Sequence, residues 1–285
     1  REDLLTRFCE LYGDKENCFI SFDSSAISRF GNSDMGNVTR NLLMTYSLNK
    51  DLRQILLQLA LTFEMPECRE ISELISKDAN ADDLSRLLSV RLLKKLATPE
   101  EILKNANELL ELSFKSNNEG IASLILDEYA NHISLAQCIK LIKNIKKPSK
   151  YNFRGIQLSV ENFIKNLPLY LVLDVVNCFY EMLNVQPYIS SFRCLVSNKN
   201  EWLFASTELA VLRLLKTKEN SYWTYNVLEI ISRAQIYHNS SHYGRPNDEL
   251  PLAVKELKQL NDKLFWHDVQ KERARNENDQ KINRF

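Results

Sequence analysis

The basic side chains between residues 140 and 154 are the residues whose type and spacing most clearly indicate binding chemistry. No acidic residue interrupts this segment, and Tyr151 and Phe153 lie inside it. Lys140, Lys143 and Lys147 are predicted to project on neighbouring turns of a helix that ends near residue 145, so their positive charges add at one end. The candidate partner-binding or anion-binding residues are Lys140, Lys143, Lys146, Lys147, Lys150 and Arg154.

Two interpretations of this basic run stay open. Cations are favourable at a helix C-terminus, where the helix dipole is negative, so the run could simply end a helix and begin a solvated linker. The functional interpretation is contact with an anionic partner: phosphate, a phosphoinositide headgroup, nucleic acid or an acidic protein surface. Two aromatic rings are weak evidence for base stacking, so the nucleic-acid version depends mainly on charge.

His238 and His242 are the second chemical candidate, with Asp248 and Glu249 close behind them in the sequence. Histidines four residues apart share one face of a helix and can bind a transition metal. However, the intervening residues 239–241 are Asn-Ser-Ser, which favour a loop, and no glutamate follows His238 as the zinc-protease motif requires. We therefore expect no bound metal and no cofactor.

Other catalytic signals are missing from the sequence. It contains no glycine-rich phosphate loop, no GxSxG, no kinase motif set and no zinc-type spacing of cysteine and histidine. Asp174 and Glu181 are spaced like a carboxylate pair for acid–base catalysis, but no histidine lies near them in the sequence to support that chemistry. A non-enzymatic protein is expected, and an all-helical enzyme with a site near His238 and His242 is the alternative.

The aromatic residues Trp202, Tyr222, Trp223 and Tyr225 form the third candidate, with Trp202, Tyr222 and Trp223 as the proposed partner-groove residues. Aromatic side chains in a helical protein usually belong to the core. The functional alternative is a partner groove, since Trp and Tyr are enriched at the energetic centres of protein interfaces.

Charge and cysteine usage restrict the class of protein. Lys plus Arg and Asp plus Glu number 37 each, so no overall field attracts nucleic acid or a membrane surface. The six cysteines are scattered without a CxxC pair, which favours a reducing compartment. No signal peptide or membrane span is predicted, and we expect an intracellular, cytoplasmic protein.

The elements that must position these residues are predicted to be helices. Only six glycines and seven prolines occur in 285 residues, and helix interiors exclude both residue types. Residues 98–101, Thr-Pro-Glu-Glu, form a capping-box signal for a helix that runs to about residue 115. The most apolar stretch, 167–183, is predicted to be the central buried helix. Further helices are predicted over 2–12, 38–48, 52–63, 66–75, 84–96, 119–132, 135–145, 156–166, 188–196, 200–215, 222–237 and 252–273.

These elements predict an all-α protein, an irregular α-solenoid or multi-helix bundle built of stacked helical hairpins. A single elongated domain is expected over residues 1–272, with a possible sub-boundary at 146–155 and a polar, frayed tail over 273–285. The function expected for this architecture is protein–protein interaction or scaffolding, with another protein as the partner. The oligomeric state does not follow from the sequence.

Overall fold

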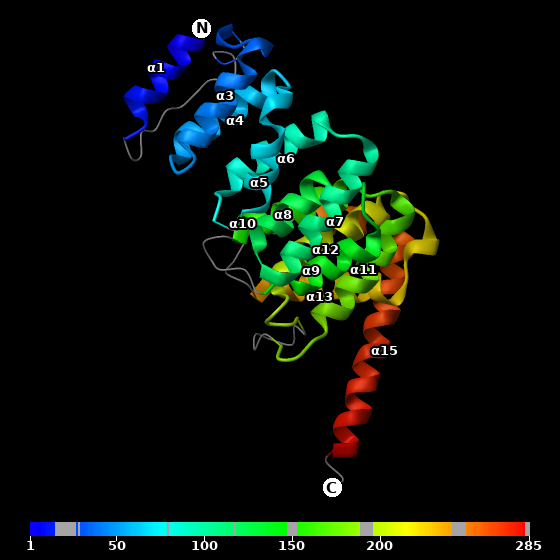
Figure 1. Ribbon diagram of the computed structural model, residues 1–285. Helices are drawn as coiled ribbons and strands as arrows, with labels where there is room; N and C mark the ends of the chain where they lie inside the picture. The colour runs from blue at the N-terminus through cyan, green and yellow to red at the C-terminus, as the bar shows by residue number, and fades with distance from the viewer. Residues whose placement is uncertain are drawn as a thin grey trace. The chain divides into compact units, whose positions relative to one another are not determined.

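The computed structural model shows an all-α protein, which confirms the predicted fold class (Figure 1). It describes residues 1–14, 27, 29–78, 80–116, 118–146, 153–188, 196–240 and 249–282, with the backbone only at 153–154, 237–240 and 275–282. Within these ranges there are fourteen α-helices and no β-strand. The β-type pairing seen there is an isolated antiparallel bridge between Tyr188 and Ser197.

The chain divides into two compact units, Arg1–Ser134 and Leu135–Phe285, which we call unit 1 and unit 2. The division falls between two predicted helices and lies before the predicted sub-boundary at 146–155. The predicted single elongated domain over residues 1–272 and its sub-boundary at 146–155 stay predictions.

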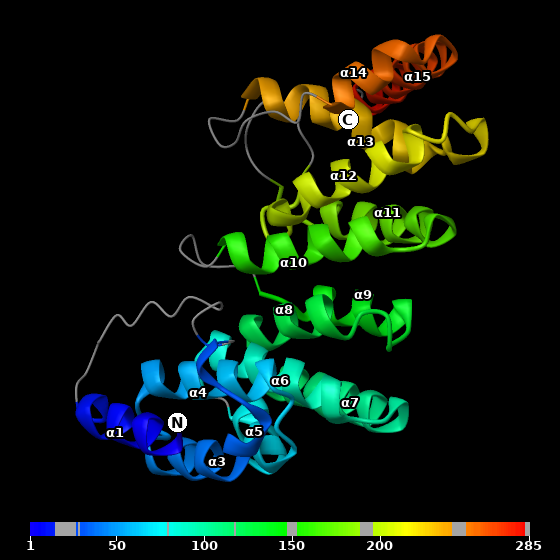
Figure 2. The same cartoon turned by 90° about the horizontal axis from the view of Figure 1, so that it is seen from above.

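Unit 1 is a stack of helices in which α4 packs against α3 and α6, and α6 packs against α5 and α8 (Figure 2). Its core lies along α4, where Leu52, Leu56 and Leu57 are fully buried. The helices of unit 1 are α1 (Glu2–Tyr12), α3 (Gly36–Thr45), α4 (Lys50–Thr62), α5 (Arg69–Lys77), α6 (Asp83–Leu96), α7 (Pro99–Ser116) and α8 (Glu119–Glu128), with short 3-10 helices at Ser33–Met35 and Pro66–Cys68.

Polar caps fix where several of these helices begin. The capping box predicted for α7 is confirmed: the Thr98 backbone N–H donates to Glu101 Oε2 at 2.8 Å, and the Glu101 N–H donates to Thr98 Oγ1 at 3.4 Å. Asn118 caps α8 by accepting a hydrogen bond from the Ile121 N–H at 3.2 Å. These local signals are visible in the sequence because cap and helix lie within four residues of each other.

Unit 2 is organised around α12, which packs against α10, α11, α13 and α14 (Figure 2). Nine of the twelve residues of α12 are buried, whereas α11 buries one face and exposes Tyr170, Asp174 and Glu181. The helices of unit 2 are α9 (Leu135–Asn144), α10 (Phe153–Asn166), α11 (Leu169–Leu183), α12 (Phe204–Leu215), α13 (Tyr225–Ser240), α14 (Glu249–Glu256) and α15 (Lys258–Ile282), with 3-10 helices at Glu201–Leu203 and Asn220–Tyr222.

Three predictions about unit 2 need correction. The central helix is α12 rather than α11, because α12 has helices on more of its sides. The predicted helix 188–196 is wrong at its start, since Tyr188 is bridged to Ser197; residues 189–195 lie outside the described residues. The predicted helix 252–273 is two helices that meet at Leu257, and the backbone of the predicted tail is helical as far as Ile282.

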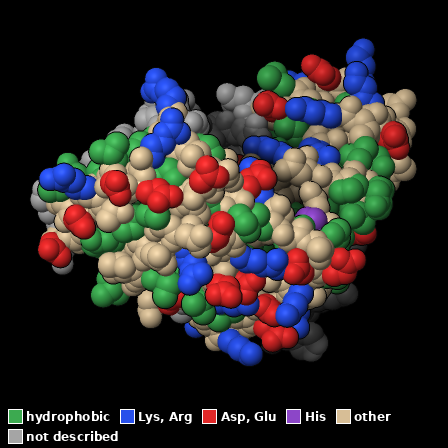
Figure 3. All heavy atoms as spheres, turned by 45° about the horizontal axis from the view of Figure 1, so that its top comes forward, with side chains coloured by type: hydrophobic (Ala, Val, Ile, Leu, Met, Phe, Trp, Pro, Cys, Tyr) green, Lys and Arg blue, Asp and Glu red, His purple; other side chains and the backbone are tan. Residues whose placement is uncertain are grey.

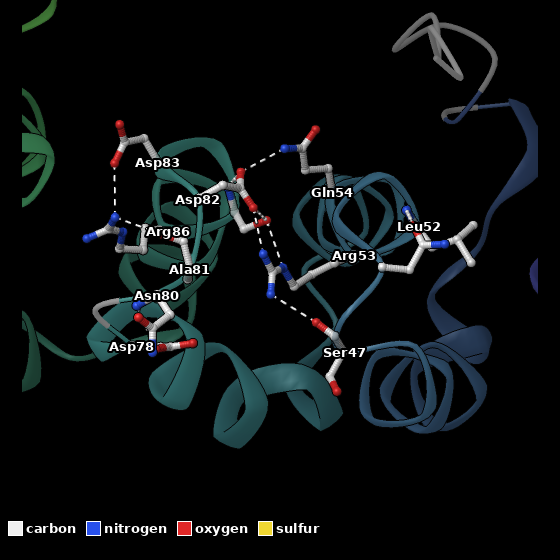
Figure 4. Close-up of polar contacts among 12 residues, drawn as sticks. Ser47, Leu52, Arg53, Gln54, Asp78, Asn80, Ala81, Asp82, Asp83 and Arg86 are labelled. Carbon is white, nitrogen blue, oxygen red and sulfur yellow. Dashed lines mark hydrogen bonds and ion pairs between the residues drawn. The ribbon is translucent and has the colours of Figure 1, made fainter. Parts of the chain in front are cut away.

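A polar network joins α4 to α6 in unit 1 and is built on Asp82 (Figure 4). Asp82 Oδ1 accepts the Ser85 backbone N–H at 3.0 Å and the Gln54 side-chain amide at 2.7 Å. Asp82 Oδ2 accepts Arg53 Nη2 and Ser85 Oγ, each at 2.7 Å. Arg53 also donates to the Ser47 carbonyl at 2.9 Å. One carboxylate therefore caps α6 and binds the guanidinium of α4.

Replacing Asp82 tests this network. Asp82→Ala removes the helix cap and leaves the largely buried Arg53 without its counter-charge, so we expect the free energy of unfolding to fall by about 2–4 kcal/mol. The measurement is urea denaturation followed by circular dichroism. The control is Glu111→Ala, which removes an exposed surface pair with Lys115 and should change stability by less than about 0.5 kcal/mol. Equal losses in the two variants would contradict the proposed role of Asp82.

The same network predicts a pH dependence of stability. Burial raises the pKa of Asp82, but the hydrogen bonds from Ser85, Arg53 and Gln54 outweigh burial and lower the pKa to about 2, below its ordinary value of 3.8. The stabilisation is therefore fully present above the ordinary pKa and is lost as the pH falls toward 2. The stability difference between wild type and Asp82→Asn should be constant at neutral pH and shrink over this acidic range. A difference that grows on acidification would show that the sign is wrong.

Candidate functional site: a buried ionic cluster and the helix that it holds

Helix α15 has few apolar residues with which to pack against unit 2. Leu260 and Leu264 are buried, and the stripe that they begin continues with His267 and Lys271 at the same helical spacing. Half of the inward stripe is therefore polar or charged. Groups of this kind are stable inside a protein only when their hydrogen-bonding partners are present.

The partner of both polar residues is the carboxylate of Glu229 on α13, whose side chain is 3% exposed. Lys271 Nζ lies 2.8 Å from Glu229 Oε1 and 2.9 Å from Oε2. His267 Nε2 lies 3.0 Å from Glu229 Oε2. Arg233, one turn along α13, donates from Nε to Glu229 Oε1 at 2.7 Å. We call these four residues the Glu229 cluster.

Electrostatics keep Glu229 ionised in this position. Burial raises the pKa of its carboxyl group, but the hydrogen bonds from Lys271, Arg233 and His267 outweigh burial, and the net effect lowers the pKa. One negative charge thus faces the two positive charges of Arg233 and Lys271.

Helix α11 completes the surroundings of the cluster. Arg233 Nη2 donates to Asn184 Oδ1 at 2.7 Å, just after the end of α11, and the guanidinium carbon lies 5.2 Å from the centre of the Tyr180 ring. The Tyr225 ring of α13 lies 5.0 Å from the His267 ring. The cluster therefore connects three helices that are far apart in the sequence.

This arrangement is suited to holding helices together rather than to a reaction. The histidine and the carboxylate have no serine, threonine or cysteine nucleophile among their described contacts, and those contacts are taken up by fixed protein groups. Among the described residues, no three His, Cys, Asp or Glu side chains are grouped so that they could hold a metal ion. The chemistry of the Glu229 cluster is that of a buried ion-pair clamp.

The side of α15 that faces away from the clamp carries an exposed aromatic pair. Phe265 is 61% exposed and Trp266 is 59% exposed, and their rings pack edge to face with centres 5.4 Å apart. Tyr225, whose ring touches His267, is also exposed. We call the exposed α15 side chains Lys263, Phe265, Trp266 and Arg273 the α15 docking surface. Side chains this apolar, placed side by side on a surface, are typical of interfaces.

A recess between α12 and α14 is a further concave feature of unit 2. Its volume is about 250 Å³, and its apolar walls include Leu212, Leu215 and Leu252. The charged side chains around it are exposed, and the Lys216–Glu249 ion pair at 3.0 Å joins the two helices. It holds no convergent buried polar groups, among the described residues that line it, that would select a ligand or support a reaction.

The basic run is described only in part. Lys140 and Lys143 of α9 and the following Lys146 are exposed, as a binding role requires. Lys147 and Lys150 lie outside the described residues, as does the side chain of Arg154. The basic run therefore stays a prediction. On the face drawn in Figure 3, acidic and basic side chains are intermingled rather than gathered by sign.

The partner groove predicted from Trp202, Tyr222 and Trp223 needs correction. Trp202 is 2% exposed and Trp223 is 7% exposed, so both rings belong to the core of unit 2 and line no open surface. Tyr222 is half-buried. Their burial follows from their positions where the 3-10 helix Glu201–Leu203 leads into α12 and where the 3-10 helix Asn220–Tyr222 precedes α13.

The predicted metal or catalytic residues are not brought together with other reactive groups in the described part of the chain. The backbone of His238 lies in α13, but its side chain is not among those described, and His242 lies outside the described residues. Asp174 and Glu181 are exposed on α11, and Asn177 between them accepts a hydrogen bond from Asn226 at 2.9 Å. Of these three polar residues of α11, Asn177 therefore contacts α13, whereas Asp174 and Glu181 face solvent.

Sequence reasoning missed the Glu229 cluster and the α15 docking surface. The cluster joins residues 38 and 42 positions apart, and no local spacing indicates such a pairing. The exposure of the aromatic pair could have been predicted from the sequence. Successive residues of a helix point about 100° apart, so a helix that buries Leu260 and Leu264 cannot also bury Phe265 and Trp266 on the same face.

Comparisons with known proteins give no relative for this chain: no protein-family model, no curated protein and no solved structure matches it. Within the described part of the chain, no helix is both long enough and apolar enough to cross a bilayer.

Removing the carboxylate tests the clamp. Glu229→Gln removes the buried carboxylate that pairs with both Arg233 and Lys271, so we expect unit 2 to lose about 3–5 kcal/mol of stability. Lys271→Met leaves Glu229 paired with Arg233 and should cost only about 1–2 kcal/mol. Urea denaturation gives the magnitudes, and hydrogen exchange of the α15 amides should rise in both variants.

The control for the clamp is Glu256→Gln, which changes the same group at an exposed position of α14. It should leave both stability and amide exchange close to wild type. If α15 exchanges equally in Glu229→Gln and Glu256→Gln, the helix does not depend on the cluster. Lys271→Met is informative even if Glu229→Gln does not fold.

Proposed function

We propose that this chain is a protein-binding module and that its partner docks on the α15 docking surface. The observation that carries the proposal is an adjacent, exposed Phe–Trp pair on a helix whose other side is clamped by buried ion pairs. A surface of this kind is apolar at its centre and fixed in position before the partner arrives, which lowers the entropic cost of association.

The energetics of the aromatic pair support a binding role. Each ring leaves more than half of its surface in water, where apolar area is unfavourable by roughly 25 cal/mol per Å². Trp in particular is over-represented among residues that dominate interface affinity. A partner that covers both rings recovers this free energy.

The basic run at residues 140–154 is the second candidate contact. The exposure of Lys140, Lys143 and Lys146 supports it, and an anionic partner such as phosphate, phosphoinositide or nucleic acid would be its ligand. The enzyme alternative has no comparable support, because none of the predicted acid, base or metal-ligating groups meet among the described residues.

A pull-down from host-cell lysate with three variants tests the proposal. Phe265→Ala/Trp266→Ala should abolish capture of a partner that wild type retains, because the double change removes the apolar centre of the surface. Tyr170→Ala, which removes a still more exposed ring from α11, should retain the partner. Lys143→Glu/Lys146→Glu/Lys147→Glu should also retain it, whereas loss in this variant alone would move the contact to the basic run.

Tryptophan fluorescence gives a second readout on the same molecules. Trp266 is exposed while Trp202 and Trp223 are buried, so acrylamide should quench mainly Trp266 in the free protein. The captured partner should protect Trp266 from the quencher. A partner that binds while Trp266 stays fully accessible would contradict docking on this surface.

A further inference from the structure

We infer that the α15 docking surface packs against the same surface of a second copy of this chain, with the two α15 helices antiparallel about a two-fold axis. The inference rests on the proposed function, since it names the partner of that surface. It is carried by a stripe of side chains along α15 that is apolar at its centre and oppositely charged at its two ends.

The outer side of α15 has the residue spacing of a helix-packing face. Four residues that follow one another at intervals of four, three and four lie in line along it, and we call them the outer stripe: Asp262, Trp266, Val269 and Arg273. The outer stripe repeats the spacing of the inward stripe with an offset of two residues. Two residues correspond to about 200° around a helix, so the two stripes lie on opposite sides of α15.

Solvent reaches the whole outer stripe. Trp266 is 59% exposed, Asp262 and Arg273 are exposed, and Val269 is half-buried. A helix face that only meets water is usually polar throughout, whereas this one places a tryptophan and a valine one turn apart at its centre. The outer stripe therefore has the composition of a contact face and is not covered by the described part of unit 2.

The charges of the outer stripe are complementary to themselves when a second α15 runs in the opposite direction. Asp262 and Arg273 lie equally far from a two-fold axis that passes between positions 267 and 268, and so do Trp266 and Val269. Asp262 of each copy then faces Arg273 of the other, and each Trp266 faces a Val269. Two ion pairs thus border the apolar centre. A parallel pair in register would instead set like charges against each other at both ends, which is unfavourable.

The residues that border the outer stripe fit the same arrangement. Lys263 and Gln270 lie along one border, and Phe265 and Glu272 lie along the other. Antiparallel packing brings equal borders of the two helices together, so Lys263 lies beside Gln270 of the second copy and Phe265 lies beside Glu272. None of these four described side chains faces a like charge in this register.

The charge balance of this side of α15 favours a second copy over a strongly charged partner. Two acids, Asp262 and Glu272, and two bases, Lys263 and Arg273, are exposed there and cancel in net charge. Nucleic acid or an anionic membrane would be attracted by an excess of positive charge, which this balance does not supply. A second α15 carries the same residues in the reverse order, and that order is what the stripe requires.

The end of α15 leaves room for the second helix. The helix is 25 residues long, and its side chains at 272–274 are exposed. Figure 1 shows its second half extending past α11, α12 and α13. A helix that extends alone into water is only marginally stable, because most helical stability in proteins comes from packing. A second α15 lying alongside would supply that packing.

Sedimentation equilibrium of the full chain tests the inference. The chain has a mass of 33.2 kDa, and we expect the apparent mass to rise toward that of two copies as the concentration is raised. A contact between two helix faces is smaller than the roughly 1,600 Å² of a standard interface, so we expect a dissociation constant on the order of 10 µM. Quenching of Trp266 by acrylamide should fall over the same concentrations, because pairing covers the ring.

Exchange of the two end charges tests the antiparallel register. Asp262→Arg sets two positive charges against each other, Arg273→Asp sets two negative charges against each other, and each change acts on both ion pairs of the dimer. Each variant should therefore associate about tenfold or more weakly than wild type. Asp262→Arg/Arg273→Asp restores opposite charges at both ends and should associate within about threefold of wild type.

The apolar centre and the controls complete the set of variants. Trp266→Ala should weaken association by at least about tenfold, since the ring lies at the centre of the contact. Asp174→Arg makes the same charge change as Asp262→Arg at an exposed position of α11, and Tyr170→Ala removes an exposed ring from that helix. Both control variants should associate like wild type.

The outcomes separate this inference from the proposed function. The antiparallel pair is wrong if wild type stays at 33.2 kDa at every concentration, if Trp266→Ala associates as well as wild type, or if the double charge exchange associates no better than the single ones. A chain that stays monomeric but captures a host-cell protein, and loses it in Phe265→Ala/Trp266→Ala, would overturn the second copy while supporting docking on α15. If that variant retains every captured protein as well, the proposed function is also wrong.

Discussion

The position of α15 depends on the buried carboxylate of Glu229. Two of the four residues on the inward stripe of this helix are His267 and Lys271, and neither could be buried without a partner. Glu229 binds both, while Arg233 and Asn184 carry the same network to the end of α11. Ion pairs of this kind are directional, so they fix the rotation of the helix about its own axis more strictly than apolar contacts would.

That rotation decides what α15 shows to solvent. With Leu260, Leu264, His267 and Lys271 turned inward, helical geometry leaves Phe265 and Trp266 outside.

The two units use a buried carboxylate differently. Asp82 in unit 1 joins the start of α6 to an arginine of α4. Glu229 binds polar side chains at positions of α15 where apolar residues would otherwise pack, and the aromatic pair of that helix is exposed.

Most of the helical framework could be predicted from local patterns. The capping box at Thr98 and Glu101, the Asn118 cap and the apolar spacing of α4 each lie within a few residues, and the helices begin near the predicted positions. The break at Leu257 was missed because no proline or glycine marks it. The sequence predicted α11 as the central helix, whereas the structure has α12 in that position. The prediction failed because the hydrophobicity of a segment measures how apolar the helix is and not how many helices surround it. The Glu229 cluster depends on contacts between distant segments, for which a single sequence holds no spacing rule.

Under the proposed function, clamping and docking place opposite demands on the same helix, and α15 meets them on different faces. The inward stripe needs charges that are desolvated and paired, which makes it rigid, whereas the proposed docking contact needs rings that stay exposed until a partner covers them. A catalytic site would require reactive groups that stay accessible, yet the histidine and carboxylate that meet in unit 2 are enclosed by Tyr225 and by their own ion-pair partners. The polar chemistry of the cluster serves to hold a helix, and the surface that results is suited to recognition.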